Sequence, residues 1–282
     1  MTSSLVVAVH GATGTQGAPV VRRLLSAGHS VRAIARDPGR LPAGAAPAAA
    51  DLLDTEALIA AYTGVDAAVV QLPLVVDHSA MAQAESVLAA LGKAGVPRVV
   101  FNVGGPMPHG PVGVPFLDAR NLLRVHLPEV VATVSLVGPL ATYQENLAAP
   151  WSAPLVAAGE VVYPLPAEAP IAWLAVDDLA DVIAELVTQP APVAVAVLAG
   201  PEDLTGPQVA AELSAVVGRP VRWRTLTPPE FADLLRPHLG DAVAAGMAAG
   251  YEAPPPAADP AVIRRGPTTL RAWAARQPWS AT

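Results

Sequence analysis

Three glycines at a spacing of three residues, Gly11, Gly14 and Gly17, lie close to the N-terminus. They follow a short apolar run, 5–10, and precede a segment, 18–27, in which valines and leucines recur at helical spacing. A strand that passes through a glycine turn directly into a helix is the first unit of a parallel α/β sheet. This feature therefore constrains the fold of the chain more than any other.

Each glycine of this turn has a distinct physical role. Gly11 lets the chain turn sharply, Gly14 lets backbone N–H groups approach a ligand, and Gly17 lets the helix pack against the strand. The N-terminus of a helix attracts negative charge, so a pyrophosphate suits this turn. We therefore predict a dinucleotide site here, rather than a turn with a purely structural role. The site also includes Thr13, Thr15 and Gln16.

The first half of the chain alternates between two kinds of apolar pattern. Runs typical of buried strands occur at 5–10, 31–35, 47–50, 67–72, 98–103 and 132–137. Segments typical of helices occur at 18–27, 54–62, 79–94 and 116–125. This alternation predicts an α/β fold, a Rossmann-type, doubly wound parallel sheet with helices on both faces.

The pattern loosens after residue 138, where proline-rich segments separate short elements. We expect strands at 171–175 and 193–198 and helices at 179–188 and 206–217. Thr205 is placed to cap the last of these helices, and Asp177 or Asp178 to cap the one before it. We predict two domains: residues 1–140 bind the dinucleotide, and residues 141–282 form a smaller substrate-binding lobe that returns in part to the main sheet.

The residue at the end of the second expected strand selects between the two nicotinamide dinucleotides. An acidic residue there holds the ribose 2′-hydroxyl of NAD, whereas an arginine accommodates the 2′-phosphate of NADP. Arg36 occupies this position, and Arg40 follows one turn later. Asp37 would repel a phosphate if its carboxylate pointed inward, but it is better suited to cap the turn before Pro38. We therefore predict NADP(H), rather than NAD(H), as the cofactor.

Further contacts with the cofactor are expected where the other strands end. Asp51 and Leu52 follow the third expected strand, in the place of a pair that contacts adenine, although Asp51 could equally be a helix N-cap. The other residues expected beside the cofactor follow the fourth, fifth and sixth strands: Leu72, Pro73, Gly104, Gly138 and Pro139.

Taken together, these motifs resemble those of one family. The segments that carry the resemblance are 11–17, 36–38, 51–54, 136–139, 143–147, 171–184 and 204–221. The first is typical of short-chain dehydrogenase/reductases, and Tyr143-Gln-Glu-Asn-Leu147 is similar to a motif of their atypical, NmrA-like group. The resemblance implies either an NADP(H)-dependent oxidoreductase or a non-catalytic NADP-binding redox sensor. Among the enzymes, the chain resembles ketoreductases of aromatic polyketide antibiotic pathways.

The standard catalytic pair of short-chain dehydrogenases is absent. That pair is a tyrosine that donates a proton and a lysine, four residues later, that lowers the tyrosine pKa. The only lysine is Lys93, and residue 89 is an alanine. Where NmrA-like enzymes often carry a lysine, early in the helix after strand five, this chain has Arg120. An arginine is a poor proton donor, but it could polarise a carbonyl, bind a cofactor phosphate or ribose, or simply be a solvated helix charge.

Three other polar residues are candidates beside the nicotinamide, each with a structural alternative. Asn102 could donate a hydrogen bond to a substrate oxygen or brace the turn at Gly104-Gly105. Tyr143 could donate a proton without help from a lysine or form an aromatic wall of the pocket. His109, in a proline-rich loop, has a pKa range suited to proton transfer or is simply exposed.

Composition argues against several other functions. The formal net charge is −7 and no basic block exceeds two arginines, so nucleic acid is not expected as a partner. No apolar run approaches the ~20 residues of a membrane span, and no positively charged leader precedes the first strand. The chain has no cysteine, and its six histidines include no His-x-x-x-His pair, so we expect no metal site. The absence of cysteine suits a cytoplasmic protein, which we expect to be a monomer or a homodimer.

We therefore predict an NADPH-dependent reductase that transfers hydride to the carbonyl of an apolar, aromatic polyketide-like ketone without the tyrosine–lysine pair. With no evident acid, the substrate would provide its own activation, as hydroxylated aromatic ketones and quinones do. An apolar pocket for a flat substrate is expected from Trp151, Trp173, Tyr143 and Met107. The alternatives are an NADPH quinone reductase and a redox sensor that binds NADP without turnover.

Overall fold

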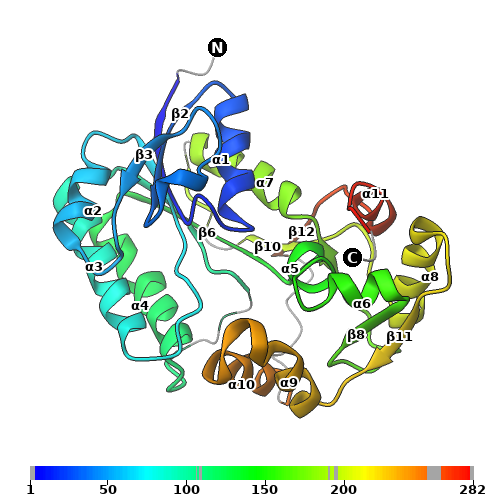
Figure 1. Ribbon diagram of the computed structural model, residues 1–282. Helices are drawn as coiled ribbons and strands as arrows, with labels where there is room; N and C mark the ends of the chain where they lie inside the picture. Colours follow the sequence, from blue (N-terminus) through cyan, green and yellow to red (C-terminus); the bar gives the residue numbers. More distant parts are fainter. Residues whose placement is uncertain are drawn as a thin grey trace. The chain divides into compact units, whose positions relative to one another are not determined.

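The structure is a computed structural model that describes residues 4–105, 107, 110–189, 191–193, 196–252 and 262–279 (Figure 1). The chain divides into two compact units. The first unit comprises Met1–Gly138 and Leu179–Val197, and the second comprises Pro139–Asp178 and Leu198–Thr282. Among the helices in the described ranges, none is long and apolar enough to cross a membrane.

The main sheet of the described residues has eight strands in the order β12-β10-β6-β5-β4-β1-β2-β3. Their bounds are β1 Val6–His10, β2 Ser30–Ala35, β3 Ala46–Ala49, β4 Ala67–Val70, β5 Arg98–Asn102, β6 Thr133–Pro139, β10 Ala196–Ala199 and β12 Ile263–Arg265. Neighbouring strands from β6 to β3 pair in parallel. Strands β1, β4 and β5 are buried almost throughout, which explains their continuous apolar runs. The predicted α/β, Rossmann-type sheet is confirmed.

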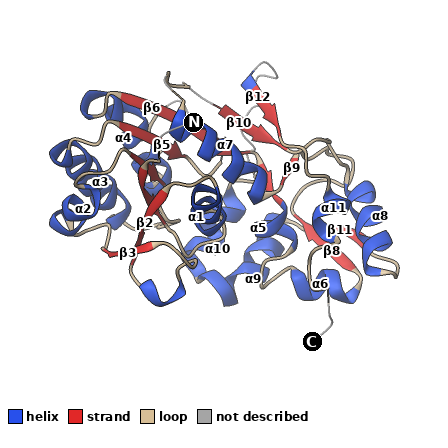
Figure 2. Ribbon diagram, turned by 90° about the horizontal axis from the view of Figure 1, so that it is seen from above, coloured by secondary structure: helices blue, strands red, loops and turns tan. Residues whose placement is uncertain are grey.

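Helices cover both faces of this sheet (Figure 2). One face carries α2 (Thr55–Tyr62), α3 (Ser79–Ala94) and α4 (Pro115–Val130), and the other carries α1 (Gly17–Ser26) and α7 (Val176–Thr188). The core under α2, α3 and α4 includes side chains with no exposed area: Leu58, Leu91, Phe101 and Leu123. Burial on both faces gives the sheet the rigidity that a site at its edge requires.

Three elements differ from their predicted ranges. The helix expected at 116–125 continues to Val130 through Pro128, because Leu127 extends its buried face and offsets the one hydrogen bond that the proline removes. The strand expected at 171–175 contains only β9, Trp173–Leu174. The strand expected at 193–198 is described at Ala196–Ala199, and residues 194 and 195 lie outside the described residues.

The predicted helix caps have different outcomes. A capping box between Thr205 and Gln208 confirms the cap of α8 (Gly206–Val217). Helix α7 begins at Val176, so the prediction that Asp177 or Asp178 caps it is wrong. Asp178 is 5% exposed, and its carboxylate accepts hydrogen bonds from the N–H and the hydroxyl of Thr268, at 3.0 and 2.6 Å. A buried carboxylate requires such partners. Asp178 therefore binds the C-terminal segment at Thr268 and does not cap α7.

The second unit is built from short elements around an aromatic core. Its parallel strand pairs are β7 (Ala141–Thr142) with β9, and β8 (Glu160–Tyr163) with β11 (Arg222–Thr225). Its other helices are α5 Tyr143–Leu147, α6 Ala153–Ala158, α9 Pro228–Leu239, α10 Asp241–Ala249 and α11 Leu270–Ala274. The largest side chains of the core are Tyr143, Tyr163, Trp173 and Trp273.

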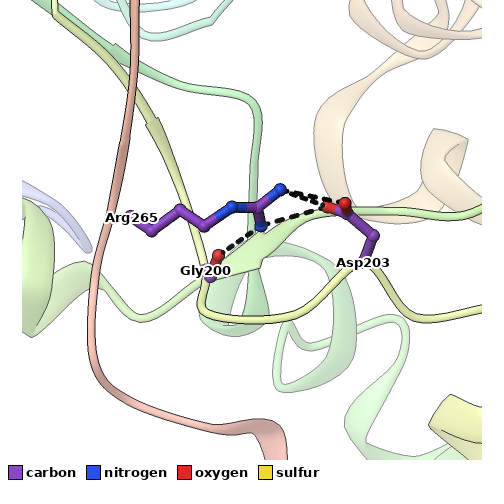
Figure 3. Close-up of polar contacts among 3 residues, drawn as sticks. All are labelled: Gly200, Asp203 and Arg265. Atoms are coloured by element: carbon purple, nitrogen blue, oxygen red, sulfur yellow. Dashed lines mark hydrogen bonds and ion pairs between the residues drawn. The ribbon is translucent and has the colours of Figure 1, made fainter. Parts of the chain in front are cut away.

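An arginine joins β12 to the loop after β10 (Figure 3). Arg265 donates a hydrogen bond to the Gly200 carbonyl oxygen at 2.8 Å and binds both carboxylate oxygens of Asp203, the shorter contact being 2.9 Å. A Cβ on Gly200 would lie 1.6 Å from the Trp173 carbonyl oxygen, so the two backbones pass too close for a side chain. These contacts fix the C-terminal segment within the second unit.

Candidate functional site

The glycine turn lies at the point where the strand order of the sheet reverses. From β1 the chain proceeds to β2 and β3 on one side, and then crosses to β4, β5 and β6 on the other. At such a switch point the loops after two neighbouring strands diverge, which leaves a crevice at the carboxyl ends of the strands. The Gly11–Gly17 turn follows β1 at this position.

Packing within the protein requires two of the three glycines. Gly11 has φ +57°, and its carbonyl oxygen accepts a hydrogen bond from the Gly14 N–H at 2.8 Å. A Cβ on Gly11 would lie 2.3 Å from Nε2 of Gln71, and one on Gly17 would lie 2.1 Å from the Gly11 carbonyl oxygen. Helix α1 therefore starts in direct contact with the end of β1, as the sequence predicts for Gly17.

The third glycine has a different environment. A Cβ on Gly14 would meet only the Gly11 carbonyl oxygen, at 3.2 Å, among the described atoms within 4 Å. Gly14 also lacks the positive φ that would demand a glycine. Gln16 is the N-cap of α1, but its side chain makes no capping hydrogen bond, and the first turn carries no acidic residue. The positive end of α1 is thus not neutralised by an acidic residue of its first turn or by a side-chain cap, which suits a phosphate group.

A network of amide side chains lies beneath this turn. Asn102, at the end of β5 and 2% exposed, donates through Nδ2 to Oε1 of Gln16 at 2.7 Å and, more weakly, to Oε1 of Gln71 at 3.4 Å. Its Oδ1 accepts a hydrogen bond from the Gly104 N–H at 3.0 Å. Gln71 in turn donates to the His10 carbonyl oxygen at 3.1 Å. The predicted bracing of the Gly104 turn by Asn102 is confirmed.

A buried histidine ends β1 behind the turn. The His10 ring stacks on Tyr62 of α2 with ring centroids 5.7 Å apart, and its Nε2 is hydrogen-bonded to the Tyr62 hydroxyl. Burial lowers the pKa of His10 to about 4, although a hydrogen bond to the Gln71 backbone opposes this effect. Burial also raises the pKa of Tyr62 well above its ordinary value. Both groups are therefore neutral at pH 7 and pack as part of the core.

The end of β2 carries the residues expected to select the cofactor. Arg36 and Arg40 are exposed, with Arg40 in the short 3₁₀ helix η1 (Pro38–Arg40). The Asp37 carboxylate accepts a hydrogen bond from the Gly39 N–H at 2.9 Å. This confirms that Asp37 caps the turn.

The end of β3 carries the pair expected beside adenine. Asp51 accepts a hydrogen bond from the Leu53 N–H at 2.9 Å, whereas Asp54 caps α2 through the Ala57 N–H at 3.0 Å. The alternative that Asp51 is the helix N-cap is therefore wrong. Contact of Asp51 and Leu52 with adenine stays a prediction.

Two further glycines lie at the ends of β5 and β6. A Cβ on Gly104, which has φ +74°, would lie 3.3 Å from Nη2 of Arg120. The Arg120 guanidinium also lies over the Phe116 ring, 5.2 Å from its centroid. A Cβ on Gly138 would lie 2.7 Å from Cγ2 of Val103. The absence of a side chain at Gly104 thus leaves room for the Arg120 guanidinium beside the end of β5.

A known protein family matches most of the chain. The sequence pattern of the NmrA-like family matches residues 3–253. The chain belongs to the NmrA-like family. A curated relative, the NAD(P)H azoreductase of Xenophilus azovorans, is 33% identical over 228 residues, which cover 79% of this chain and 77% of the azoreductase.

Solved structures share the fold at lower sequence identity. A nucleoside-diphosphate-sugar epimerase of Staphylococcus aureus superposes with a TM-score of 0.74 at 19% identity, covering 96% of this chain and all of the epimerase. The NADPH complex of the quinone oxidoreductase QOR2 of Escherichia coli superposes with a TM-score of 0.72 at 24% identity, covering 95% and 98% of the two chains. At these identities the superpositions show that the NmrA-like chain shares the fold of both proteins.

Two residues that were predicted for the site of this NmrA-like protein, Pro139 and Tyr143, lie in the second unit. Tyr143 is 1% exposed, stacks on Trp273 with centroids 5.0 Å apart, and donates its hydroxyl to the Thr268 carbonyl oxygen at 3.3 Å. Burial, with the charges of Glu202 and Asp178, raises the pKa of Tyr143 above its ordinary value. A side chain this buried does not line an open pocket, so the expectation that Tyr143 forms a pocket wall is wrong. Its role as proton donor stays a prediction, as does the contact of Pro139 with the cofactor.

The residues expected to form an aromatic pocket have different environments. Trp173 is fully buried in the core of the second unit, so the expectation that it lines a pocket is wrong. Trp151 is partly exposed and lies 5.9 Å from the His238 ring. In the first unit Leu72 is buried and Pro73 is exposed after β4. His109 lies outside the described residues.

Sequence reasoning missed Gln71, which touches both the turn and Asn102. The available signal was a polar residue directly after the four apolar residues of β4. A polar side chain at the carboxyl end of a central strand lies at the edge of the sheet that carries the glycine turn, as Asn102 does.

Proposed function

We propose that the protein is an NADP(H)-dependent reductase that binds the cofactor pyrophosphate at the Gly11–Gly17 turn. One observation carries this proposal: at the switch point of the sheet, the positive end of α1 has no acidic residue in its first turn and no side-chain cap. Packing within the protein requires Gly11 and Gly17, whereas a Cβ on Gly14 would make one tight contact, 3.2 Å from the Gly11 carbonyl oxygen, without the severe clash found at Gly17. A phosphate group approaching the backbone explains the third glycine.

We propose that Arg36, with Arg40, binds the 2′-phosphate of NADP(H). Both arginines are exposed at the end of β2, and the Asp37 carboxylate that could oppose them is directed to the Gly39 N–H. An arginine binds a phosphate through several N–H donors. The azoreductase relative, which is named for both nicotinamide cofactors, supports NAD(P)H without deciding between them.

Bound NADPH would supply hydride, and the chain would hold it in place. Asp51 and Leu52 are proposed at the adenine, and Leu72, Pro73, Gly104 and Gly138 toward the nicotinamide. Arg120, which reaches the carboxyl edge of the sheet beside Gly104, is proposed to polarise an acceptor oxygen or to hold a cofactor oxygen. Positioning and a fixed charge can provide much of the rate without a proton donor.

The substrate class follows from how the acceptor carries negative charge after reduction. The chain has no tyrosine–lysine pair, so acceptors that form a stabilised anion are favoured. Quinones and azo compounds are such acceptors, and the named relatives are an azoreductase and a quinone oxidoreductase. Among ketones, we propose aromatic polyketide-like ones whose neighbouring hydroxyl polarises the carbonyl.

The proposal is tested by mixing the purified protein with NADPH and a panel of acceptors, and following the loss of NADPH absorbance. The panel contains quinones, azo dyes, hydroxyaryl ketones and simple alkyl ketones. Turnover of the first three classes but not of alkyl ketones would support the proposal. Tight binding of NADPH with no turnover on any acceptor would contradict it and favour the redox sensor.

A further inference from the structure

We propose that Gln71 holds the Gly11–Gly17 turn in one shape and thereby raises the affinity of the protein for NADP(H). This inference rests on the proposed binding of the cofactor pyrophosphate at that turn. Gln71 is a positioning residue in this proposal, because it acts on the cofactor through the backbone of the turn and does not itself touch the cofactor.

Gln71 lies where the two central strands of the sheet separate. The parallel pairing of β1 with β4 ends at Val9 and Val69. Gln71 follows β4 directly, just as Gly11 follows β1. The loops after these strands diverge at the switch point, and the partly buried side chain of Gln71 crosses from one loop to the other.

The amide of Gln71 continues the hydrogen bonding of the sheet beyond the paired residues. Its Nε2 donates to the carbonyl oxygen of His10, the last residue of β1, at 3.1 Å. A carbonyl oxygen can only accept, so the nitrogen of the amide must face His10. The Oε1 oxygen then accepts, more weakly, from Nδ2 of Asn102 at 3.4 Å. The orientation of the amide is thus determined by both of its ends.

This donation fixes the peptide unit through which the chain enters the turn. The His10 carbonyl and the Gly11 N–H belong to one planar peptide. The next peptide is fixed by the Gly14 N–H, which donates to the Gly11 carbonyl oxygen at 2.8 Å. The dihedral angles of Gly11, including its φ of +57°, lie between these two peptides and are therefore restrained from both sides.

The same amide packs against the two glycines that the fold requires. A Cβ on Gly11 would lie 2.3 Å from Nε2 of Gln71, and one on Gly17 would lie 3.0 Å from it. The amide therefore fills the space that the missing side chains leave. Glycine is conformationally permissive unless its surroundings restrain it. A turn already held in one shape binds a phosphate with a smaller loss of conformational entropy.

Removal of the amide tests the inference through binding. Gln71→Met keeps an unbranched side chain of similar length but has no N–H donor. We expect this variant to bind NADP⁺ roughly threefold to tenfold more weakly than the wild type, the scale of one lost hydrogen bond. Titration calorimetry measures the Kd. Gln189→Met, which replaces a partly buried glutamine of the same unit that donates to Glu185, should leave the Kd unchanged.

Gln71→Glu restores the donor only while its carboxyl group is protonated. The acid can donate to the His10 carbonyl oxygen as the amide does, whereas the carboxylate can only accept and is repelled by that oxygen. Beside the new group, His10 and Tyr62 are neutral between about pH 5 and 8, and Asn102 does not titrate. Relative to the wild type, we expect the Kd to be more than about tenfold higher at about pH 8 and to fall at least about threefold by about pH 5.

Two comparisons separate this role from other effects. Repulsion between the carboxylate and the cofactor would weaken binding in Gln71→Glu but would leave Gln71→Met at the wild-type Kd. A purely structural role would change the free energy of unfolding, measured with urea at each pH, but not the Kd of the folded variants. Either result would overturn the role of Gln71 and leave the proposed function standing.

The outcome remains decisive if one variant does not fold. Where Gln71→Glu is unfolded at about pH 8, the Kd of Gln71→Met against that of Gln189→Met decides the question. Where Gln71→Met is unfolded, the change in Kd of Gln71→Glu with pH decides it. Failure of the wild type to bind NADP⁺ would overturn both this inference and the proposed function.

Discussion

A Cβ atom on Gly17 would lie 2.1 Å from the carbonyl oxygen of Gly11. This contact means that α1 and the end of β1 meet at backbone distance, with no room for a methyl group. Gly14, in the same turn, lacks a positive φ and would meet that oxygen at 3.2 Å. The three glycines of one motif therefore divide into those that the fold requires and one that a ligand would require.

Alanine at positions 14 and 17 should separate these requirements. The added methyl group of Gly17→Ala would clash with the carbonyl oxygen of Gly11, so this substitution should lower the free energy of unfolding by about 3 kcal/mol or more. Gly14→Ala should lower it by less than about 1 kcal/mol, but should weaken NADP⁺ binding more than about tenfold. Urea unfolding and titration calorimetry on both variants test this. Unimpaired binding by a folded Gly14→Ala would contradict the proposed pyrophosphate position.

The fold was predictable because each strand of the first unit is an apolar run that ends at a glycine or a polar residue. Right-handed crossovers between parallel strands then limit the order in which those runs can lie in the sheet. The sequence does not show the direction of a side chain that could serve either of two roles, such as a helix cap or a contact with a distant segment. Asp178 is adjacent to a helix start, and only the approach of Thr268 from the far end of the chain shows that its carboxylate points there.

The candidate site likewise contains residues that the sequence reveals and residues that only the structure reveals. Gly11, Gly14 and Gly17 were readable because their spacing carries their function. Gln71 is marked in the sequence only as the polar residue that follows the apolar run of β4, and its contacts with the turn and with Asn102 are seen only in the structure. The prediction for Trp173 is wrong for a related reason. An aromatic residue in a proline-rich segment suits either a pocket or a core, and only its burial in the structure shows that Trp173 belongs to the core.

Arg36 should determine the preference for NADPH. Removal of its charge takes away donors to the 2′-phosphate, which NADH lacks, so Arg36→Ala should weaken NADPH binding about tenfold or more and leave NADH unaffected. The Kd of each cofactor is measured by calorimetry. Arg22→Ala, which removes an exposed arginine from α1, is the matched charge control. An unchanged preference in Arg36→Ala would refute the role given to Arg36.

The adjacent carboxylates Asp177 and Asp178 should differ in their contribution to stability. Asp178→Ala leaves the Thr268 N–H and hydroxyl without their acceptor in a buried place, which should cost about 2–4 kcal/mol of unfolding free energy. Asp177 is exposed, so Asp177→Ala should change it by less than about 0.5 kcal/mol. Denaturant unfolding measures both. Equal effects would show that the bonds to Thr268 are not what makes Asp178 important.

His10 should make the stability of the protein depend on pH between its folded and unfolded pKa values. Burial lowers its pKa from 6.5 to about 4, so between these values the unfolded chain binds a proton that the folded chain does not. Unfolding free energy should therefore fall as pH decreases from 6.5 to 4, by roughly 3 kcal/mol in all. Urea unfolding across this range measures the slope.

The slope can be assigned to His10 by substitution. His10→Gln removes the titrating group from the buried position beside Tyr62 and should abolish most of the dependence, even though the variant is less stable at every pH. His126→Gln changes a histidine whose side chain is 45% exposed and should leave the slope intact. If His10→Gln kept the wild-type slope, the proton taken up on unfolding would belong to another group, and the neutral state assigned to His10 in the fold would be wrong.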